Sequence, residues 1–187
     1  MITVRGNSVS ETGLVERIRK QDTSAMRELY DAYAGYLTGV CHRYITDYDQ
    51  AKDILQESFI KIFKHIGSFR YQGQGSLRAW MSRIVVNESL KSLRKKPMFS
   101  LVDAYPDVEA SDEDPGLTDV PMPVIMEMIR ALPDGYRTVF NLFVFENKSH
   151  KEIAGLLGIR ENSSCSQYFR ARALLAKQIK EYKRKQQ

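Results

Sequence analysis

The chain has too few cysteines and histidines for a covalent or metal-based framework. Its 187 residues include two cysteines, Cys41 and Cys165, and three histidines, His42, His65 and His150. The cysteines lie on separate helical patterns, and the histidines are scattered where a zinc site needs clustered ligands. We therefore expect no disulfide, no metal, no cofactor and no catalytic residue.

Long apolar runs are also missing. No stretch approaches the roughly 20 residues that a membrane-spanning helix needs, and the first residues lack an apolar segment of signal-peptide length. We therefore expect a cytoplasmic protein without membrane insertion. Strand-like alternation of useful length is absent as well, whereas apolar residues recur at helical intervals, so the sequence predicts an all-α fold.

One segment, 97–123, lacks lysine and arginine altogether. It contains seven acidic residues and five of the six prolines, a composition typical of a linker. The rest of the chain holds 28 basic and 16 acidic residues. This surplus favours a polyanionic partner, although lysine-rich surfaces also serve solubility alone. We predict two small helical domains, 11–96 and 124–183, joined by an acidic linker.

Four helices are expected in the first domain. The first covers about 11–20, and Asp22, Thr23 and Ser24 offer caps for the second. The third begins after Asp47 or Asp49. Residues 1 to about 10 are predicted to be disordered.

The third helix carries a cluster of acidic and amide side chains. Clustered carboxylates can hold a metal or perform acid–base chemistry, but these have no histidine partners nearby. A solvated acidic face is the simpler interpretation. The residues are Asp47, Asp49, Asp53, Gln56 and Glu57.

The fourth helix is strongly basic. It follows a loop rich in glycine and aromatic residues, 69–75, with Ser76 as its expected cap, and runs from 77 to about 96. Trp80 is expected in its core because it shares a stripe with Ile84. Cations meet phosphates and rings stack on bases, so the pattern suits nucleic acid, but a plain basic surface helix would look the same. The polar residues in question are Arg78, Arg83, Asn87, Lys91 and Arg94.

A helix-turn-helix is predicted near the end of the chain. Ser149–Gly158 has helical spacing and ends on a glycine, and a second helix resumes at about 161–182. On that second helix we expect a buried stripe containing Tyr168 and an opposite polar face on which Phe169 is exposed. The alternatives are a groove-reading helix and an ordinary amphipathic surface helix.

Several of these stretches resemble the extracytoplasmic-function (ECF) type of bacterial RNA polymerase sigma factor. The resemblance covers about 22–96 and 124–180. The motifs that carry it are Asp53–Phe63, Leu77–Asn87, Ala131–Phe140, His150–Ala154 and Arg170–Arg172.

The resemblance implies specific partners and contact residues. Core RNA polymerase would be bound through its β′ coiled coil by Asp53, Gln56 and Glu57, and through its β flap by the second domain. The −10 promoter element would be melted, and a flipped base captured, by the loop before the fourth helix together with that helix. The −10 element would be contacted by Arg78, Arg83, Asn87, Lys91 and Arg94. The −35 element would be contacted by Cys165, Ser166, Phe169 and Arg170.

The resemblance has two departures and one further implication. Arg160 replaces the usual capping serine, so Asn162 or Ser163 is expected to cap the last helix instead, and Cys165 replaces a basic residue. Arg172 is expected nearer the core side. An anti-sigma factor is a candidate additional partner, for which hydrophobic surface between the domains would be a natural docking place.

Two other functions compete with this interpretation. A free-standing helix-turn-helix regulator that binds duplex operator DNA would leave the Asp53–Glu57 face without a purpose. A helical metal-dependent hydrolase would need a ligand set that the sequence lacks.

Overall fold

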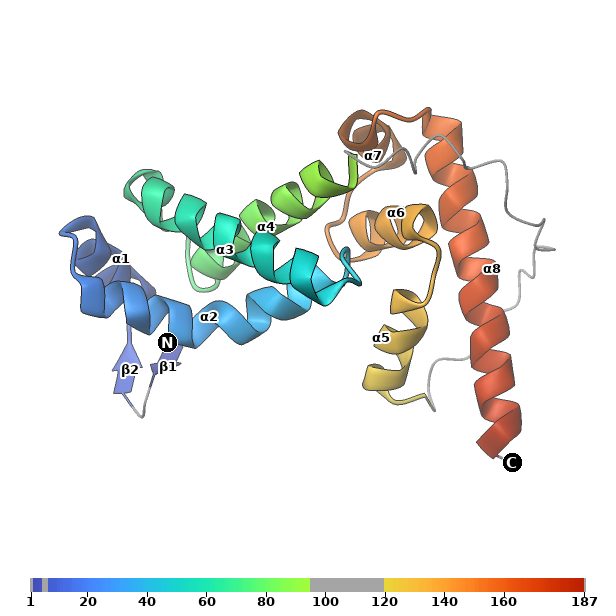
Figure 1. Ribbon diagram of the computed structural model, residues 1–187, viewed down its shortest axis with the longest axis horizontal. Helices are drawn as coiled ribbons and strands as arrows, with labels where there is room; N and C mark the ends of the chain where they lie inside the picture. Colours follow the sequence, from blue (N-terminus) through green and yellow to red (C-terminus); the bar gives the residue numbers. More distant parts are fainter. Residues whose placement is uncertain (1, 5–6, 95–119, 187) are drawn as a thin grey trace. The chain divides into compact units, whose positions relative to one another are not determined.

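The computed structural model describes residues 2–4, 7–94 and 120–186. The chain forms two compact units, Met1–Ser92 and Leu93–Gln187. Helices dominate both units, which confirms the predicted all-α class (Figure 1). Residues 97–119 of the predicted linker lie outside the described residues.

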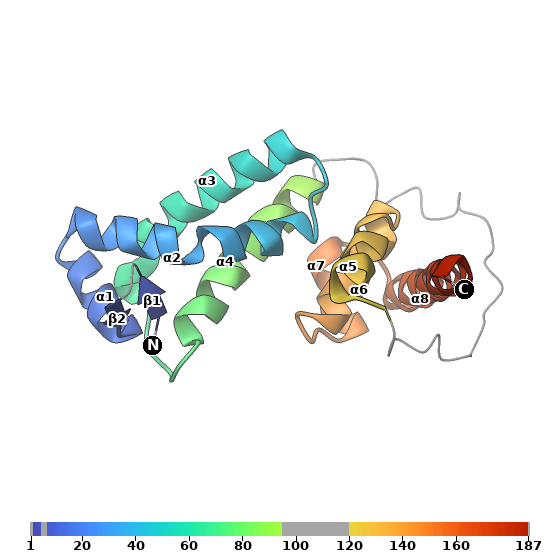
Figure 2. The same ribbon diagram turned by 90° about the horizontal axis from the view of Figure 1, so that it is seen from below.

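The first unit is a set of helices built on α2. This helix, Thr23–His42, contacts both α1 (Glu11–Arg19) and α3 (Tyr48–His65). The short 3-10 turn Ile66–Ser68 follows α3, and α4 spans Ser76–Arg94. Figure 2 shows these helices from a second direction. Each helix buries one apolar stripe, and the fully buried residues include Leu14, Leu29, Leu37, Ile62, Leu77 and Met81.

Two helix starts follow the sequence signals. The Asp22 carboxylate accepts hydrogen bonds from the backbone N–H groups of Ser24 and Ala25, at 2.9 and 3.2 Å. Asp47 accepts one from the Gln50 N–H at 2.8 Å. These side chains satisfy N–H groups that have no partner inside the helix. Among the candidates, the cap is therefore Asp22 rather than Thr23 or Ser24 at α2, and Asp47 rather than Asp49 at α3.

The prediction of disorder at the start of the chain is wrong for the described residues. Ile2–Val4 (β1) and Asn7–Val9 (β2) form an antiparallel pair in which Ile2 is opposite Val9. Three-residue strands are too short to give a periodic signal, and isolated hairpins are marginal in water. Here β1 also contacts α2, a long-range contact that sequence periodicity does not reveal.

The start of α4 differs from the prediction in two ways. Ser76 is the first helical residue rather than the cap, and its hydroxyl accepts a hydrogen bond from the Gln72 N–H in the preceding loop at 3.2 Å. Trp80 is half-buried rather than in the core, with its ring 5.4 Å from that of Phe69. Phe69, not Trp80, is the buried aromatic residue of this region.

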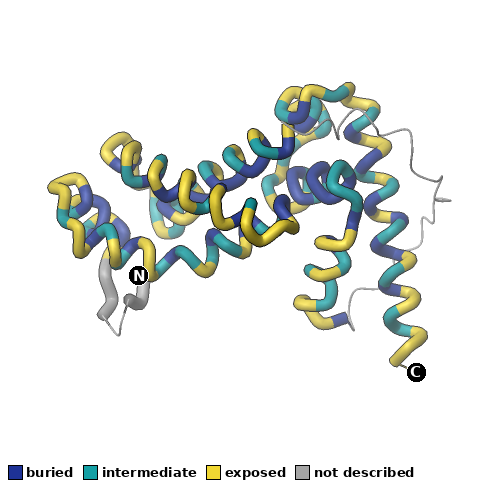
Figure 3. The backbone as a smooth tube through the Cα atoms, viewed as in Figure 1, coloured by how far each residue is buried: buried dark blue, intermediate teal, exposed yellow. Residues whose placement is uncertain are grey.

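The second unit is built on one long helix. This helix, α8 (Glu161–Gln186), contacts α5 (Met122–Arg130), α6 (Asp134–Val144) and α7 (His150–Leu157). Figure 3 shows the buried positions recurring along the inner side of α8. The core where these helices meet includes Ile129, Leu132, Tyr136, Ala171 and Leu175.

A buried cation joins α5 to α6. Arg137 is 2% exposed and donates hydrogen bonds to the carbonyl oxygens of Arg130 (3.2 Å) and Leu132 (2.8 Å). Its guanidinium also pairs with Asp134. Carbonyls at a helix end lack partners inside the helix, so the guanidinium closes the end of α5 and pins the turn into α6.

We predict that Arg137→Ala lowers the free energy of unfolding of the second unit by about 3–5 kcal/mol, because it strips hydrogen bonds from buried carbonyls and leaves a carboxylate unpaired. The exposed Arg172→Ala is the matched control and should change it by no more than about 0.5 kcal/mol.

Urea titration of the full chain, followed by circular dichroism, measures this effect. Trp80 is the only tryptophan and lies in the first unit, so its fluorescence reports that unit separately and should keep its midpoint. If Arg137→Ala and Arg172→Ala lowered the free energy of unfolding equally, the stabilising role assigned to Arg137 would be wrong.

Candidate nucleic-acid and partner-binding surfaces

The predicted acidic face of α3 is present on the surface. Asp53, Gln56 and Glu57 are all exposed, and at about 100° per residue they fall within an arc of about 100°. Ile60, 54% exposed, lies inside the same arc. The polar pattern alone did not single out Ile60, which also lines the neighbouring apolar groove.

An apolar groove of about 560 Å³ runs between α2 and α3 beside this face. Within it the rings of Tyr30 and Phe59 are 4.7 Å apart. Sequence analysis missed this groove, although a second stripe on α2 signals it at four-residue intervals. That stripe consists of Tyr30, Ala34, Thr38 and His42, and α3 contributes Tyr48, Lys52, Leu55, Gln56, Phe59, Ile60 and Phe63.

On α4 the structure brings together four of the five predicted contact residues. Arg83, Asn87, Lys91 and Arg94 are exposed and share an arc of about 80°. Arg78 lies on the opposite side of the helix, where its guanidinium carbon is 3.7 Å from the centre of the Tyr36 ring. The four form a continuous polar stripe with three cations, whereas Arg78 packs toward α2.

The loop between the 3-10 turn and α4 has an unusual backbone. Gly73 and Gly75 have φ values of +112° and +85°, which residues with a Cβ rarely adopt. Along the helix axis, Asn87 lies about 16 Å from the start of α4. A groove beside this loop is lined by the loop itself and by α1, through Thr12, Val15, Glu16 and Arg19.

The helix-turn-helix geometry is fixed at both ends of α7. Ser149 and Glu152 form a reciprocal capping box, and Gly158 ends the helix in the left-handed conformation, with φ +69°. The next helix, α8, begins at Glu161, so Arg160 occupies the cap position, and the prediction that Asn162 or Ser163 would cap it is wrong. The backbone carbonyl of Arg160 accepts the first helical bond, from the Ser164 N–H at 3.1 Å.

An aromatic cluster packs α7 and α6 against α8. The ring of Phe143 is 4.7 Å from that of His150 and 4.3 Å from that of Tyr168. His150 Nδ1 also lies 2.9 Å from the hydroxyl of the buried Ser164. Tyr168 is consequently half-buried among rings rather than fully buried. Because these residues come from three helices, helical spacing could not predict the cluster.

The outward face of α8 holds most of the predicted reading residues. Cys165, Ser166 and Phe169 are exposed, with Phe169 at 43%. Arg170 is half-buried, with Nη1 3.5 Å from the Tyr136 hydroxyl. Arg172 is exposed and lies within about 20° of Cys165 around the helix, so its expected place near the core is wrong.

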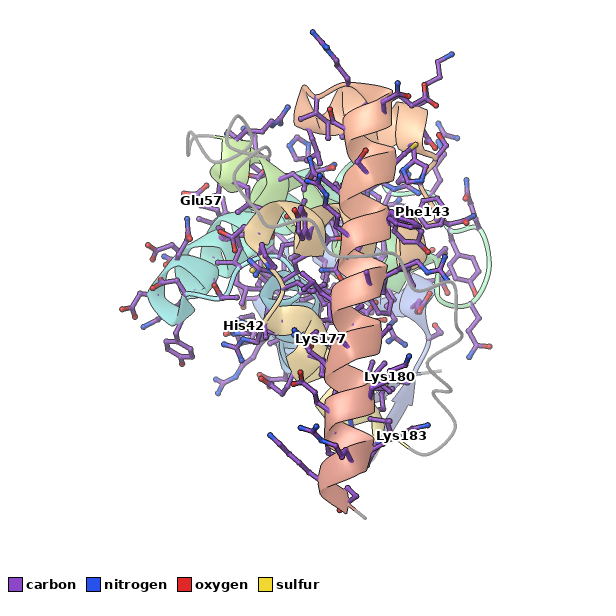
Figure 4. All side chains as sticks on the ribbon, turned by 90° about the vertical axis from the view of Figure 1, so that its right-hand side faces the viewer. His42, Glu57, Phe143, Lys177, Lys180 and Lys183 are labelled. Atoms are coloured by element: carbon purple, nitrogen blue, oxygen red, sulfur yellow. The ribbon has the colours of Figure 1, made fainter. Side chains whose placement is uncertain are left out.

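Further along α8 a series of lysines extends the basic surface. Figure 4 labels Lys177, Lys180 and Lys183 on this helix, together with Phe143 of the aromatic cluster and Glu57 of α3. The repeated cations add a sequence-independent attraction to phosphates.

The described ranges contain no candidate metal cluster, and their two cysteines are both free. No set of three or more His, Cys, Asp or Glu side chains there could hold a metal ion. Cys41 is buried, which raises the pKa of its thiol, and neither cysteine is in a disulfide. None of the helices in these ranges combines the length and hydropathy needed to cross a bilayer.

Two consecutive helical units, the second of them a helix-turn-helix, define a protein of the DNA-binding transcription class. Comparisons with known proteins make this specific. A model of Sigma-70 region 2 matches residues 29–97, and a model of Sigma-70 region 4 matches residues 124–175.

Two curated relatives match along most of their length. The RNA polymerase sigma-H factor of Pseudomonas aeruginosa is 30% identical over 180 residues, which cover 89% of this chain and 92% of that relative. The ECF RNA polymerase sigma factor SigW of Bacillus subtilis is 29% identical over 185 residues, covering 89% and 95%. The chain belongs to the ECF family of RNA polymerase sigma factors, which direct promoter recognition and transcription initiation.

A solved structure, that of CnrH in complex with the cytosolic domain of CnrY, is similar at a TM-score of 0.47. The sequence identity is 19%, and the match covers 90% of this chain and 96% of that chain.

The capping box predicts a pH dependence of the second unit. Hydrogen bonds from Lys148 (2.8 Å) and then from Ser149 lower the pKa of Glu152 from 4.5 to about 2. A carboxylate with a lowered pKa contributes stability above its unfolded pKa and loses it as the pH falls toward the folded value. We expect the chain to melt at a higher temperature than Glu152→Gln above pH 4.5, with the difference vanishing toward pH 2.

Thermal melts of both chains by circular dichroism, from pH 7 down to pH 2.5, measure this difference. A difference in melting temperature that stays constant across the whole range would contradict the prediction.

Proposed function

We propose that the protein binds core RNA polymerase through the α3 face and contacts promoter DNA with two separate helices, one in each unit. In this proposal the two domains expected from the sequence, 11–96 and 124–183, carry these surfaces. The observation that carries the proposal is the presence of three distinct exposed surfaces on two units. A helix-turn-helix regulator acting alone has no use for the surface on α3.

The polymerase contact is assigned to Asp53, Gln56 and Glu57, with Ile60 as an apolar anchor among them. Charged and amide side chains around a buried apolar centre give orientation and specificity, while the apolar centre supplies most of the affinity. The β′ coiled coil is the proposed partner of this face, and the β flap that of the second unit.

The −10 contact is assigned to the stripe on α4. In this proposal Arg83, Lys91 and Arg94 contact backbone phosphates, and Asn87 forms hydrogen bonds with a base edge. Melting needs no catalytic group, because extruding a base costs a few kcal/mol, which phosphate contacts and a preformed pocket can offset. Arg78, turned toward Tyr36, is given a supporting role in place of direct contact.

The −35 contact is assigned to the exposed face of α8. The Phe169 ring can contact a thymine methyl group, and Ser166 can form hydrogen bonds with base edges. Cys165 cannot make the bidentate contact to guanine that an arginine makes, so the preferred −35 sequence should depart from a guanine at that position. Arg172, together with Arg170, supplies positive charge toward the phosphates.

An anti-sigma factor is a third proposed partner. The apolar groove between α2 and α3 offers such a protein exposed hydrophobic surface. Acting on a chromosomal template, the protein would work in the cytoplasm.

We predict that the triple variant Asp53→Ala/Gln56→Ala/Glu57→Ala weakens binding to core polymerase at least about tenfold, because three interface side chains are lost together. All three are exposed, so the melting temperature should be nearly unchanged. Glu16→Ala, an exposed acidic change on α1, is the control. Fluorescence anisotropy of labelled protein with core polymerase measures the affinity.

Run-off transcription with core polymerase on genomic fragments tests the function itself and supplies a promoter for later work. Start sites that depend on the added protein are expected. Tight binding of the isolated protein to intact duplex DNA, with no response to polymerase, would favour the free-standing regulator instead.

Salt dependence should separate phosphate contacts from base contacts. We predict that Lys91→Ala reduces the slope of log affinity against log salt by about 1, since one phosphate contact is lost. Phe169→Ala should weaken promoter binding by about 1–3 kcal/mol without changing the slope. Filter binding of the holoenzyme to the isolated promoter over a range of salt concentrations measures both. Identical slopes for wild type and Lys91→Ala would argue against the α4 assignment.

A further inference from the structure

Helix α1 holds both ends of the loop that precedes α4. At the first residue of α1, Glu11 Oε1 accepts a hydrogen bond from the Gly75 N–H at 3.3 Å. At the last residue, Arg19 Nη2 donates to the Phe69 carbonyl oxygen at 2.5 Å. Gly75 and Phe69 are at the two ends of the loop, so α1 is hydrogen-bonded to both ends.

Glu11 is also tied to α2. The same oxygen accepts a hydrogen bond from the Tyr33 hydroxyl at 3.3 Å. Burial, followed by the charge of Glu11, raises the pKa of Tyr33, so this hydroxyl remains a donor. One carboxylate therefore connects the loop to two helices.

Stability alone does not explain a carboxylate at this position. Glu11 is only 8% exposed, and its second oxygen, Oε2, is buried without a hydrogen-bond partner among the described residues. Burying a partly satisfied carboxylate costs free energy that a well-packed apolar residue would not cost. The burial of Glu11 costs folding free energy, whereas its hydrogen bonds fix the position of the loop. We therefore look for its role in the loop.

The loop itself needs an external support. Gly73 and Gly75 adopt backbone conformations that glycine enters freely, and therefore also leaves freely. Arg70, Tyr71 and Gln72 are exposed along the loop. A guanidinium plane, a ring and an amide are groups that stack on and form hydrogen bonds with an unpaired base. Holding them in place beforehand reduces the entropy lost on binding.

We propose that Glu11 and Arg19 are positioning residues that set the shape of the Phe69–Gly75 loop and thereby its selectivity for one extruded base of the −10 element. Neither residue touches the DNA in this proposal. Both precede residue 29, where the match to Sigma-70 region 2 begins. The proposal rests on the proposed function, because it needs the loop to receive a base from melted promoter DNA.

The experiment compares Glu11→Ala, Glu11→Gln and Arg19→Ala with wild type and with a control, Arg27→Ala, which changes an exposed residue of α2 that lines neither groove. Each full-length variant is assembled with core polymerase on four versions of the isolated promoter, which differ in the base at the extruded −10 position. The readout is the ratio of open-complex formation on the best base to that on the other three. Affinity for core polymerase is measured alongside it.

We expect Glu11→Ala and Arg19→Ala to reduce this ratio about tenfold, as misplacement of a binding group does, with affinity for core polymerase unchanged. Glu11→Gln keeps an accepting oxygen for Gly75 and should retain most of the selectivity. In hydrogen exchange of the free protein, the Gly75 N–H should exchange faster in Glu11→Ala than in wild type. In Glu11→Gln it should exchange at the wild-type rate.

Two outcomes would overturn the proposal. One is an unchanged selectivity ratio in Arg19→Ala, whose exposed side chain can be removed without opening the core. The other is a Glu11→Gln variant as unselective as Glu11→Ala. Failure of the proposed function has a different signature, since wild type itself would then form no open complex with core polymerase on any of the four promoters.

Discussion

The burial of apolar stripes holds the helices of this protein in place, and the position of its exposed surfaces depends on that constraint. On α2 the stripe runs through Ala25, Leu29 and Leu37, all completely buried. Burying one large apolar side chain contributes about 1.5–3 kcal/mol, so a few such stripes stabilise a small helical unit. The remaining faces of the helices are not needed for folding. Contact residues for polymerase and DNA can therefore be placed on them at little cost to stability.

This division of labour explains which parts of the fold could be predicted. The predicted helices correspond to α1–α4, α7 and α8, and Asp22 and Asp47 were among the predicted caps; both depend on residues close together in sequence. So does the turn at Gly158, because a left-handed residue favours glycine. The outward placement of Asp53, Glu57 and Phe169 follows from the same periodicity, as the complement of the buried stripe. The resemblance to ECF sigma factors, confirmed by the comparisons, attached functions to those faces.

Several of the features that could not be predicted depend on contacts between separate elements. The β1–β2 hairpin contacts α2, and the half-buried Trp80 packs beside the buried Phe69 ring. Arg137 closes a neighbouring helix, and Glu11 reaches a loop 64 residues away. A single sequence gives each of these residues only its type and its place on a helix face. Arg172 lies within about 20° of the exposed Cys165 around α8, so helical periodicity alone places it on the outward face, and the prediction misapplied that spacing.

The length of α8 has a consequence for how target specificity can change. Its 26 residues form one rod of about 39 Å, which presents Cys165 and Phe169 near one end and packs Leu175 and Ile179 into the core beyond them. A rotation of α8 that turned different side chains toward a base would also remove Leu175 and Ile179 from the core. Target specificity in such proteins can therefore change through substitution of the exposed side chains, while the backbone of the helix keeps its position.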